Sequence, residues 1–261
     1  MKTANLTSVT IAALLGIVML AGAGCTNSKT NQETSDNMET LNLTQEWDKK
    51  FPQSDKVNHR KVTFKNRYGI TLAADLYEPK NVEGKLAAIA VSGPFGAVKE
   101  QASGLYAQTM AERGFLTLAF DPSYTGESGG EPRNVASPDI NTEDFSAAVD
   151  FLTALPNVDA ERIGIIGICG FGGMGLNAAA MDTRIKATVA STMYDMSRVN
   201  ANGYFDAEDS ADDRNKKREM MNVIRTRDAQ SGTITPGVHG LPDSITGEEP
   251  QFVKDYFDYY K

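Results

Sequence analysis

Short runs of continuous apolar residues alternate with segments of helical spacing along the middle of the chain. The apolar runs predict four buried strands, at residues 85–92, 115–120, 162–168 and 185–192. The segments between them carry apolar residues three or four positions apart and predict three helices, at residues 100–113, 142–155 and 172–181. Continuous apolar strands that alternate with amphipathic helices are typical of a parallel sheet with helices on both faces.

A β-hairpin is predicted ahead of these elements. Residues 62–65 and 72–77 alternate between apolar and polar positions, and the Asn-Arg-Tyr-Gly sequence at 66–69 is typical of a turn. The hairpin would add two antiparallel strands to one edge of the sheet, so we predict six strands in all. The second helix is expected to begin at an N-cap residue, either Asn141 or Thr142.

The first 25 residues have the pattern of an export signal. Lys2 precedes an apolar run at residues 9–21, and small residues separate this run from Cys25. The run is too short for a membrane span and is typical of a secretory signal peptide. Cleavage before Cys25 would leave a lipidated cysteine and a membrane-anchored lipoprotein, whereas cleavage after Ala23 would leave a soluble periplasmic protein. We expect an exported protein and favour the lipoprotein, because Cys25 closes the apolar run.

Three further regions follow the signal. Residues 26–45 are polar, lack hydrophobic periodicity and predict a flexible tether. Residues 46–200 contain the predicted sheet and its helices. Residues 201–261 combine a charged helical stretch with a segment rich in Gly, Pro, Ser and Thr, which predicts a helical lid or insertion rather than further sheet.

The charge of the chain is acidic, and this limits its partners. The 34 acidic residues outnumber the 26 basic ones, for a net charge of −8. This balance excludes nucleic acid as a partner, since neutralising phosphates needs clustered Lys and Arg. The sequence has no dinucleotide fingerprint, no P-loop and no metal-ligand cluster, so we expect neither a cofactor nor a metal.

A glycine-rich turn between a predicted strand and a predicted helix carries the candidate chemistry. Gly167 lies two positions before Cys169, as in the Gly-x-nucleophile-x-Gly motif of a sharp strand-to-helix turn. Phe171 takes the place of the second glycine, and a frame shifted by two residues would put Phe171 at the nucleophile's position. The register of the strand favours Cys169. The start of the helix would stabilise a thiolate, and the N–H of Gly170 would donate to an oxyanion. The alternative is a buried, unreactive thiol.

This turn and two other segments resemble the α/β-hydrolase family, in particular its dienelactone-hydrolase-like and related secreted bacterial members. Dienelactone hydrolases carry cysteine in a Gly-x-Cys-x-Gly-Gly elbow, to which residues 167–173 are similar. Residues 121–130 are similar to the Asp-x-Arg-Gly-x-Gly-x-Ser stretch that follows the fourth strand of the family. Residues 92–96 lie where the family's oxyanion loop follows the third strand.

The resemblance implies an activity and a set of site residues. Cys169 would attack a small-molecule carboxyl ester or lactone and form an acyl-thioester. The backbone N–H groups of Gly170 and Phe95 would hold the oxyanion, because Pro94 has no N–H to donate. The expected fold is an α/β-hydrolase-type, mostly parallel sheet with helices on both faces.

The resemblance also implies residues that the chain lacks. The family has eight strands, and the two that we do not predict would carry the acid and the histidine, so we expect a fold truncated at its C-terminal end. His59 precedes the first predicted strand, and His239 lies in the lid-like tail. Asp195, just past the last predicted strand, is the candidate acid or else a helix cap or surface carboxylate. The alternative to an esterase is therefore a non-catalytic surface lipoprotein or an inactive fragment of a hydrolase.

Overall fold

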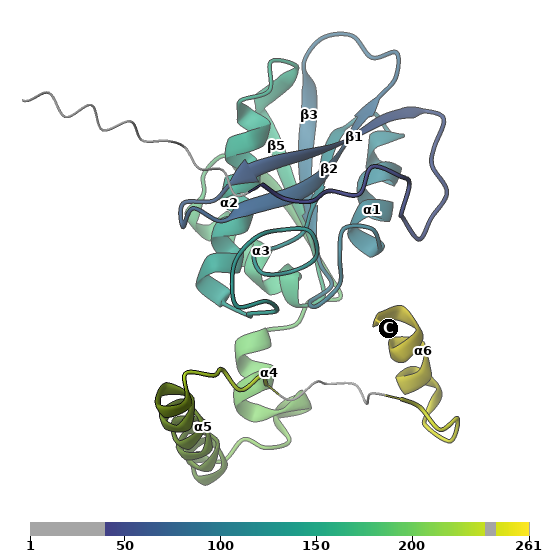
Figure 1. Ribbon diagram of the computed structural model, residues 1–261. Helices are drawn as coiled ribbons and strands as arrows, with labels where there is room; N and C mark the ends of the chain where they lie inside the picture. The colour runs from purple at the N-terminus through teal and green to yellow at the C-terminus, as the bar shows by residue number, and fades with distance from the viewer. Residues whose placement is uncertain (1–39, 238–243, 261) are drawn as a thin grey trace, which may run out of the picture. The chain divides into compact units, whose positions relative to one another are not determined.

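The computed structural model describes residues 40–237 and 244–260 (Figure 1). The expected signal peptide, Cys25 and His239 lie outside the described residues, as does most of the expected tether. A six-stranded sheet is formed by β1 (Val57–Lys65), β2 (Thr71–Pro79), β3 (Leu86–Ser92), β4 (Leu116–Phe120), β5 (Val158–Ile168) and β6 (Ile185–Ser191). The helices are α1 (Ala102–Ala111), α2 (Pro138–Thr153), α3 (Gly170–Met181), α4 (Met196–Asn202), α5 (Ala211–Ser231) and α6 (Gln251–Tyr260), with a 3₁₀ turn at Tyr204–Asp206.

The strands are ordered β1-β2-β4-β3-β5-β6 across the sheet. β2 pairs antiparallel with both β1 and β4, and the remaining neighbours, from β4 through β3 and β5 to β6, pair in parallel. This arrangement confirms the predicted fold class: a mostly parallel sheet with an antiparallel hairpin at one edge. β6 forms the other edge and is partly exposed, with about half of the Val189 side chain open to solvent.

The side chains of alternate residues in the central strands pack into two apolar layers, one on each face of the sheet. In β3, Ala88 and Ala90 join a layer with Phe145 of α2 and Met174 of α3. Their neighbours Ile89 and Val91 join a second layer with Ala107 and Ala111 of α1. The sheet therefore lies between α2 and α3 on one face and α1 on the other (Figure 1).

Helix α2 begins earlier than the sequence pattern indicated. Its N-cap is Ser137, whose hydroxyl accepts a hydrogen bond from the N–H of Ile140 at 3.4 Å. Pro138 takes the first helical position, where its missing N–H costs nothing. Asn141 and Thr142, the expected caps, are buried inside the helix. The prediction was wrong because it gave weight to the first polar residues beside the apolar stripe and overlooked the Ser-Pro pair.

Fixed contacts begin at Thr44, just before the expected start of the domain at residue 46. The N–H of Thr44 donates to Glu127 Oε1 at 2.6 Å. The indole of Trp47 donates to the carbonyl oxygen of Phe51 at 2.9 Å and packs edge-on against the rings of Phe51 and His59. This N-terminal segment therefore docks against β1 and the loop that follows β4.

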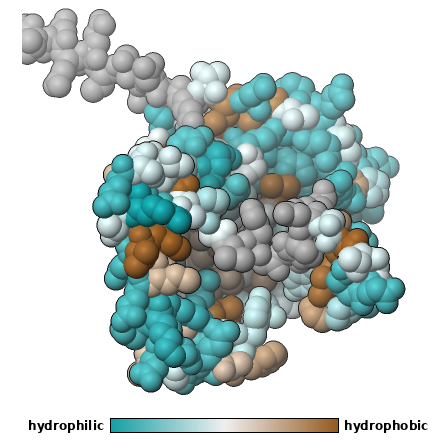
Figure 2. Space-filling view, turned by 60° about the horizontal axis from the view of Figure 1, so that its bottom comes forward, coloured by the Kyte–Doolittle hydropathy of each residue, from teal (hydrophilic) through white to brown (hydrophobic). Residues whose placement is uncertain are grey.

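The C-terminal part of the described chain is helical, as the sequence predicts, and it packs loosely. None of the described residues of α4, α5 and α6 is buried. Its exposed apolar side chains include Phe205, Val223 and Phe252. In the surface view, hydrophobic residues form separate patches among hydrophilic ones (Figure 2). In the part of the chain that the structure describes, no helix has both the length and the apolar character needed to cross a bilayer.

Candidate active site

Cys169 lies in the sharp turn between the end of β5 and the start of α3. Its backbone has φ +57° and ψ −124°, a conformation that a residue with a side chain rarely adopts. The N–H of Cys169 donates to Ser191 O at 2.9 Å, and its carbonyl accepts from the N–H groups of Gly172 at 2.9 Å and Tyr194 at 3.1 Å. The strained residue is thus held by backbone hydrogen bonds to α3, to β6 and to the segment that follows β6.

Two glycines allow this turn to form. A β-carbon on Gly167 would lie 2.2 Å from Phe171 O, which no side chain could tolerate. A β-carbon on Gly170 would lie 2.7 Å from Met196 Cγ and 3.0 Å from Phe95 Cβ. Neighbouring segments therefore approach the turn closely on both sides of Cys169, as expected of a nucleophile elbow.

The register of the turn places Cys169, and not Phe171, between strand and helix. Phe171 is only 2% exposed and packs between Phe95 and Phe145, with each pair of ring centroids 6.3 Å apart. Cys169 is partly exposed, and it packs against the apolar layer on the α1 face. The thiol is thus the chemically useful group at this turn.

The two expected oxyanion donors lie beside each other. Gly170 is the first residue of α3, so its N–H has no acceptor within the helix. Phe95 belongs to the β3–α1 loop, defined here as residues 93–101, and contacts the turn at Gly170. A β-carbon on Gly93 would lie 2.4 Å from Ile168 O, so the start of this loop also packs directly on the end of β5. The structure thus brings Cys169, Gly170 and Phe95 into one corner.

Asp195 acts as a helix cap in the structure. Its carboxylate accepts from the N–H of Arg198 at 3.0 Å at the start of α4. It directly follows Tyr194, whose N–H bonds the Cys169 carbonyl. Its part as a catalytic acid stays a prediction.

His59 is not near the turn. It lies within β1, and not ahead of the first strand as the sequence pattern indicated, and its Nε2 is 2.8 Å from Asp75 Oδ1. β2, β4 and β3 separate β1 from β5. Four strand spacings of about 4.8 Å put His59 roughly 19 Å from the strand that ends at Cys169.

The C-terminal aromatic residues pack near the turn, a placement that the sequence did not reveal. The Tyr260 hydroxyl donates to Phe95 O at 3.3 Å, and the Tyr259 hydroxyl accepts from the N–H of Ala102 at 3.2 Å. Burial and the nearby Cys169 both raise the pKa of Tyr260. Tyrosines from α6 therefore lie over the β3–α1 loop and close to the thiol.

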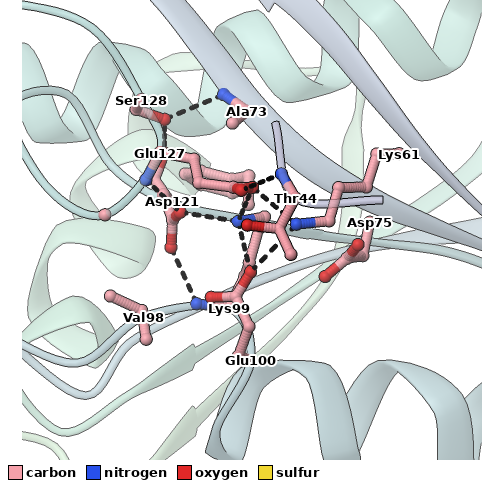
Figure 3. A network of polar contacts seen from close by, with 12 residues as sticks. Thr44, Lys61, Ala73, Asp75, Val98, Lys99, Glu100, Asp121, Glu127 and Ser128 are labelled. Atoms are coloured by element: carbon pink, nitrogen blue, oxygen red, sulfur yellow. Dashed lines mark hydrogen bonds and ion pairs between the residues drawn. The ribbon is translucent and has the colours of Figure 1, made fainter. Parts of the chain in front are cut away.

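A group of buried and partly buried charges lies at the far end of the β3–α1 loop (Figure 3). We call it the Lys99 cluster; its members are Lys61, Lys99, Glu100, Asp121 and Glu127. Lys99 Nζ lies 2.5 Å from Glu100 Oε1, 2.9 Å from Asp121 Oδ2 and 2.7 Å from Glu127 Oε2. Lys61 Nζ completes the cluster at 2.7 Å from Glu127 Oε2.

The ionisation of the Lys99 cluster follows from burial and pairing. Burial would lower the pKa of Lys99, but Asp121 and the neighbouring glutamates outweigh it and raise that pKa. Burial raises the pKa of Asp121, against the attraction of Lys99. Burial also acts to raise the pKa of Glu127, but hydrogen bonds from Lys61 and Lys99 lower it to about 2. Sequence reasoning missed this cluster; its signals were Asp121 at the end of a predicted strand and the stretch at 121–130, which also contains Glu127.

Comparison with known proteins identifies the family of the chain. The family model described as X-Pro dipeptidyl-peptidase (S15 family) matches residues 68–234. The uncharacterized protein PA2218 of Pseudomonas aeruginosa is 62% identical over 252 residues, which are 95% of this chain and 67% of that protein. The crystal structure of PA2218 matches with a TM-score of 0.79 at 66% identity, covering 85% of this chain and 68% of that one.

Two more distant proteins are also similar to this chain. The thiohydrolase aneE of Aspergillus aculeatus is 31% identical over 137 residues, 52% of this chain and 42% of that protein. The α/β hydrolase GrgF from Penicillium has a TM-score of 0.60 at 23% identity, covering 77% of this chain and 64% of that one, and shows a shared fold. The α/β-hydrolase expectation is thereby confirmed, whereas the dienelactone-hydrolase-like assignment stays a prediction. The chain belongs to the X-Pro dipeptidyl-peptidase (S15) family, and its relatives include hydrolases.

Proposed function

We propose that the chain hydrolyses a small-molecule carboxylic ester or lactone with Cys169 as the nucleophile. The observation that carries the proposal is the strained backbone of Cys169 at the turn between β5 and α3. A positive φ at a residue other than glycine is retained where the surrounding structure holds it, and such positions cluster at active sites. The closeness of Gly170 and Phe95 to the thiol supports oxyanion stabilisation by their N–H groups.

The reaction would pass through two acyl transfers. The Cys169 thiolate attacks the carbonyl carbon, a C–S bond forms, and the negative charge moves to the carbonyl oxygen beside the N–H groups of Gly170 and Phe95. Collapse of this intermediate breaks the C–O bond, and the leaving alkoxide takes a proton from water. Water then attacks the acyl-thioester, which releases the carboxylic acid and the Cys169 thiol. The hydroxide left by the first step takes the thiol proton and restores the thiolate.

Among the described residues no histidine lies at the turn, which favours substrates with a good leaving group. His59 pairs with Asp75, so within the described residues it gives no proton-transfer group to Cys169. General acid catalysis is worth about 10²–10⁴-fold, and an amine leaving group depends on it far more than a phenolate or thiolate does. Activated esters and thioesters are therefore favoured over the peptides that the family description names. The thiohydrolase relative supports the same substrate class.

Hydrolysis of p-nitrophenyl acetate tests the proposal. We expect a burst of p-nitrophenolate, equal to the amount of protein, followed by slow turnover as the acyl-thioester hydrolyses. Cys169→Ala should abolish both phases. Cys25→Ala is the matched control, because the sequence has two cysteines and only Cys169 lies in the turn. Equal rates for the wild type and Cys169→Ala would overturn the proposal.

A binding protein that keeps the fold without turnover is the competing function, and the position of His59 favours it. Iodoacetamide labelling separates the two functions, since alkylation needs an accessible, reactive thiol. Rapid modification of Cys169 at neutral pH supports the hydrolase. A thiol that reacts only after unfolding supports the binding protein.

We also propose that the mature protein is exported and anchored in a membrane through lipid on Cys25. The support is the apolar run at residues 9–21 followed by small residues and a cysteine. Metabolic labelling with a palmitate analogue tests it. The label should be lost in Cys25→Ala and kept in Cys169→Ala; a label that survives Cys25→Ala would contradict the anchor.

A further inference from the structure

We infer that Asp121 is a positioning residue for acyl transfer: it fixes the β3–α1 loop so that the N–H of Phe95 faces the oxyanion. This inference rests on the proposed function of Cys169. Asp121 does not touch the turn. It acts through the loop that does.

A single carboxylate joins the loop that follows β3 to the loop that follows β4. Asp121 follows β4, and its Oδ1 accepts from the backbone N–H of Lys99 at 2.7 Å. Its Oδ2 accepts from Lys99 Nζ at 2.9 Å and from the backbone N–H of Glu127 at 2.9 Å. Figure 3 shows these bonds. Asp121 and Lys99 are both fully buried, so water does not compete for the bonds between them. Such charge-assisted bonds are stronger than neutral ones.

The loop transmits this restraint because both of its ends are held. At its start, Gly93 packs on Ile168 O. Within it, the N–H of Ala97 donates to Pro94 O at 3.0 Å, and the N–H of Val98 donates to Gln101 Oε1 at 3.1 Å. Phe95 therefore lies on a short, internally bonded segment between the turn and Lys99. Releasing the Lys99 end would let Phe95 shift relative to the oxyanion.

Small displacements of an oxyanion donor have large effects on rate. A misplacement of about 1 Å can cost about 10²-fold, and loss of one donor costs about 10²–10³-fold. Asp121→Asn keeps the size of the side chain but puts an amide donor where two N–H groups and an ammonium now point. It therefore breaks at least one of the bonds that fix the loop.

Asp144 provides a matched control. It too is fully buried, and it holds the same loop after β4 through the backbone N–H and the hydroxyl of Ser123, at 2.8 and 2.7 Å. Its other partners are Asn66 at 2.8 Å and Asn141 at 3.2 Å. None of these residues belongs to the β3–α1 loop. Asp144→Asn should therefore destabilise the fold without a selective effect on acyl transfer.

Two reactions of the same thiol separate positioning from general damage. Acylation by p-nitrophenyl acetate passes through an oxyanion, whereas alkylation by iodoacetamide does not. In Asp121→Asn we expect the acylation rate to fall roughly tenfold to a hundredfold with little change in the alkylation rate. In Asp144→Asn the ratio of the two rates should match that of the wild type. Melting temperatures of both variants show whether each is folded at the assay temperature.

Glu127→Gln is the second variant, for use if Asp121→Asn does not fold. It keeps Asp121 but weakens the bonds of Glu127 to Lys99 Nζ and Lys61 Nζ. Only Lys99 belongs to the β3–α1 loop, so we expect a fall of about threefold in acylation alone. The positioning role is overturned if the ratio of the acylation rate to the alkylation rate in Asp121→Asn and Glu127→Gln equals that of the wild type, including the case in which both rates fall together. Failure of the proposed function is distinguished at the outset, because the wild type would then match Cys169→Ala. That result would also remove the oxyanion that Asp121 is inferred to serve.

Discussion

The helices that cover the sheet and the helices after β6 form for different reasons. In α2, Phe145, Val149 and Leu152 are all fully buried against the sheet. In α5 no described residue is buried, and local features support the helix: Ser210 accepts from the N–H of Asp213 at 3.0 Å, and Gly232 ends it with φ +70°. Local terms alone make a helix only marginally stable. The stability of the fold should therefore reside in residues 57–191, and the later helices should contribute little.

The largest expected effect comes from removing a buried ring. Phe145→Ala takes a fully buried side chain from the layer between α2 and β4, where it packs edge-on against Phe120 with centroids 5.2 Å apart. Such a deletion leaves a cavity and costs about 3–5 kcal/mol. Urea denaturation followed by circular dichroism measures the change in the free energy of unfolding.

Phe205→Ala removes the same group from the 3₁₀ turn after α4. Phe205 is fully exposed, so we expect a change within about 0.5 kcal/mol. A comparable loss of stability in the two variants would contradict the division between the regions.

A smaller effect on stability is expected from neutralising either of two separate carboxylates, Glu127 and Asp206, each of which has a lowered pKa. Hydrogen bonds from Lys61 and Lys99 hold the pKa of Glu127 at about 2 against burial. Arg198 lowers the pKa of the partly exposed Asp206 to about 2. A folded pKa below the ordinary value stabilises the protein above that ordinary value, near 4.5 for glutamate, and this contribution is lost as the pH falls through the folded pKa. Glu127→Gln should therefore cost about 1 kcal/mol at neutral pH after solvent screening.

Urea midpoints measured from neutral pH down to about pH 2.5 test this sign. The gap between the wild type and Glu127→Gln should narrow as the solution is acidified below about pH 4.5. For Asp206→Asn the midpoint should match that of the wild type throughout, because solvent screens its pair with Arg198. A gap for Glu127→Gln that widens in acid would show that its charge does not stabilise the fold.

The sequence predicted most of the sheet because buried strands are marked by short local runs of apolar residues. The runs at 85–92, 115–120, 162–168 and 185–192 match β3, β4, β5 and β6 to within a few residues at their ends, and the turn at Cys169 has a local glycine signature. Burial of neighbouring apolar side chains needs no long-range information to be recognised.

The Lys99 cluster could not be predicted in the same way. Lys61, Lys99, Asp121 and Glu127 come together only because β4 lies between β2 and β3 in the sheet. No periodicity marks such charges, and single charged residues ordinarily indicate exposed positions. The packing of Tyr260 on Phe95 depends in the same way on a contact between distant segments.

The docked N-terminal segment gives the protein an optical probe. Trp47 is the one tryptophan of the sequence, and it lies beside Phe51 and His59 with Lys49 Nζ 5.5 Å from its ring centre. The side chain of Lys49 is itself fully buried. The indole emission therefore reports whether this segment covers the charges beneath it. If the emission maximum of Trp47 shifts to the red before helix is lost on denaturation, the N-terminal segment detaches before the sheet unfolds.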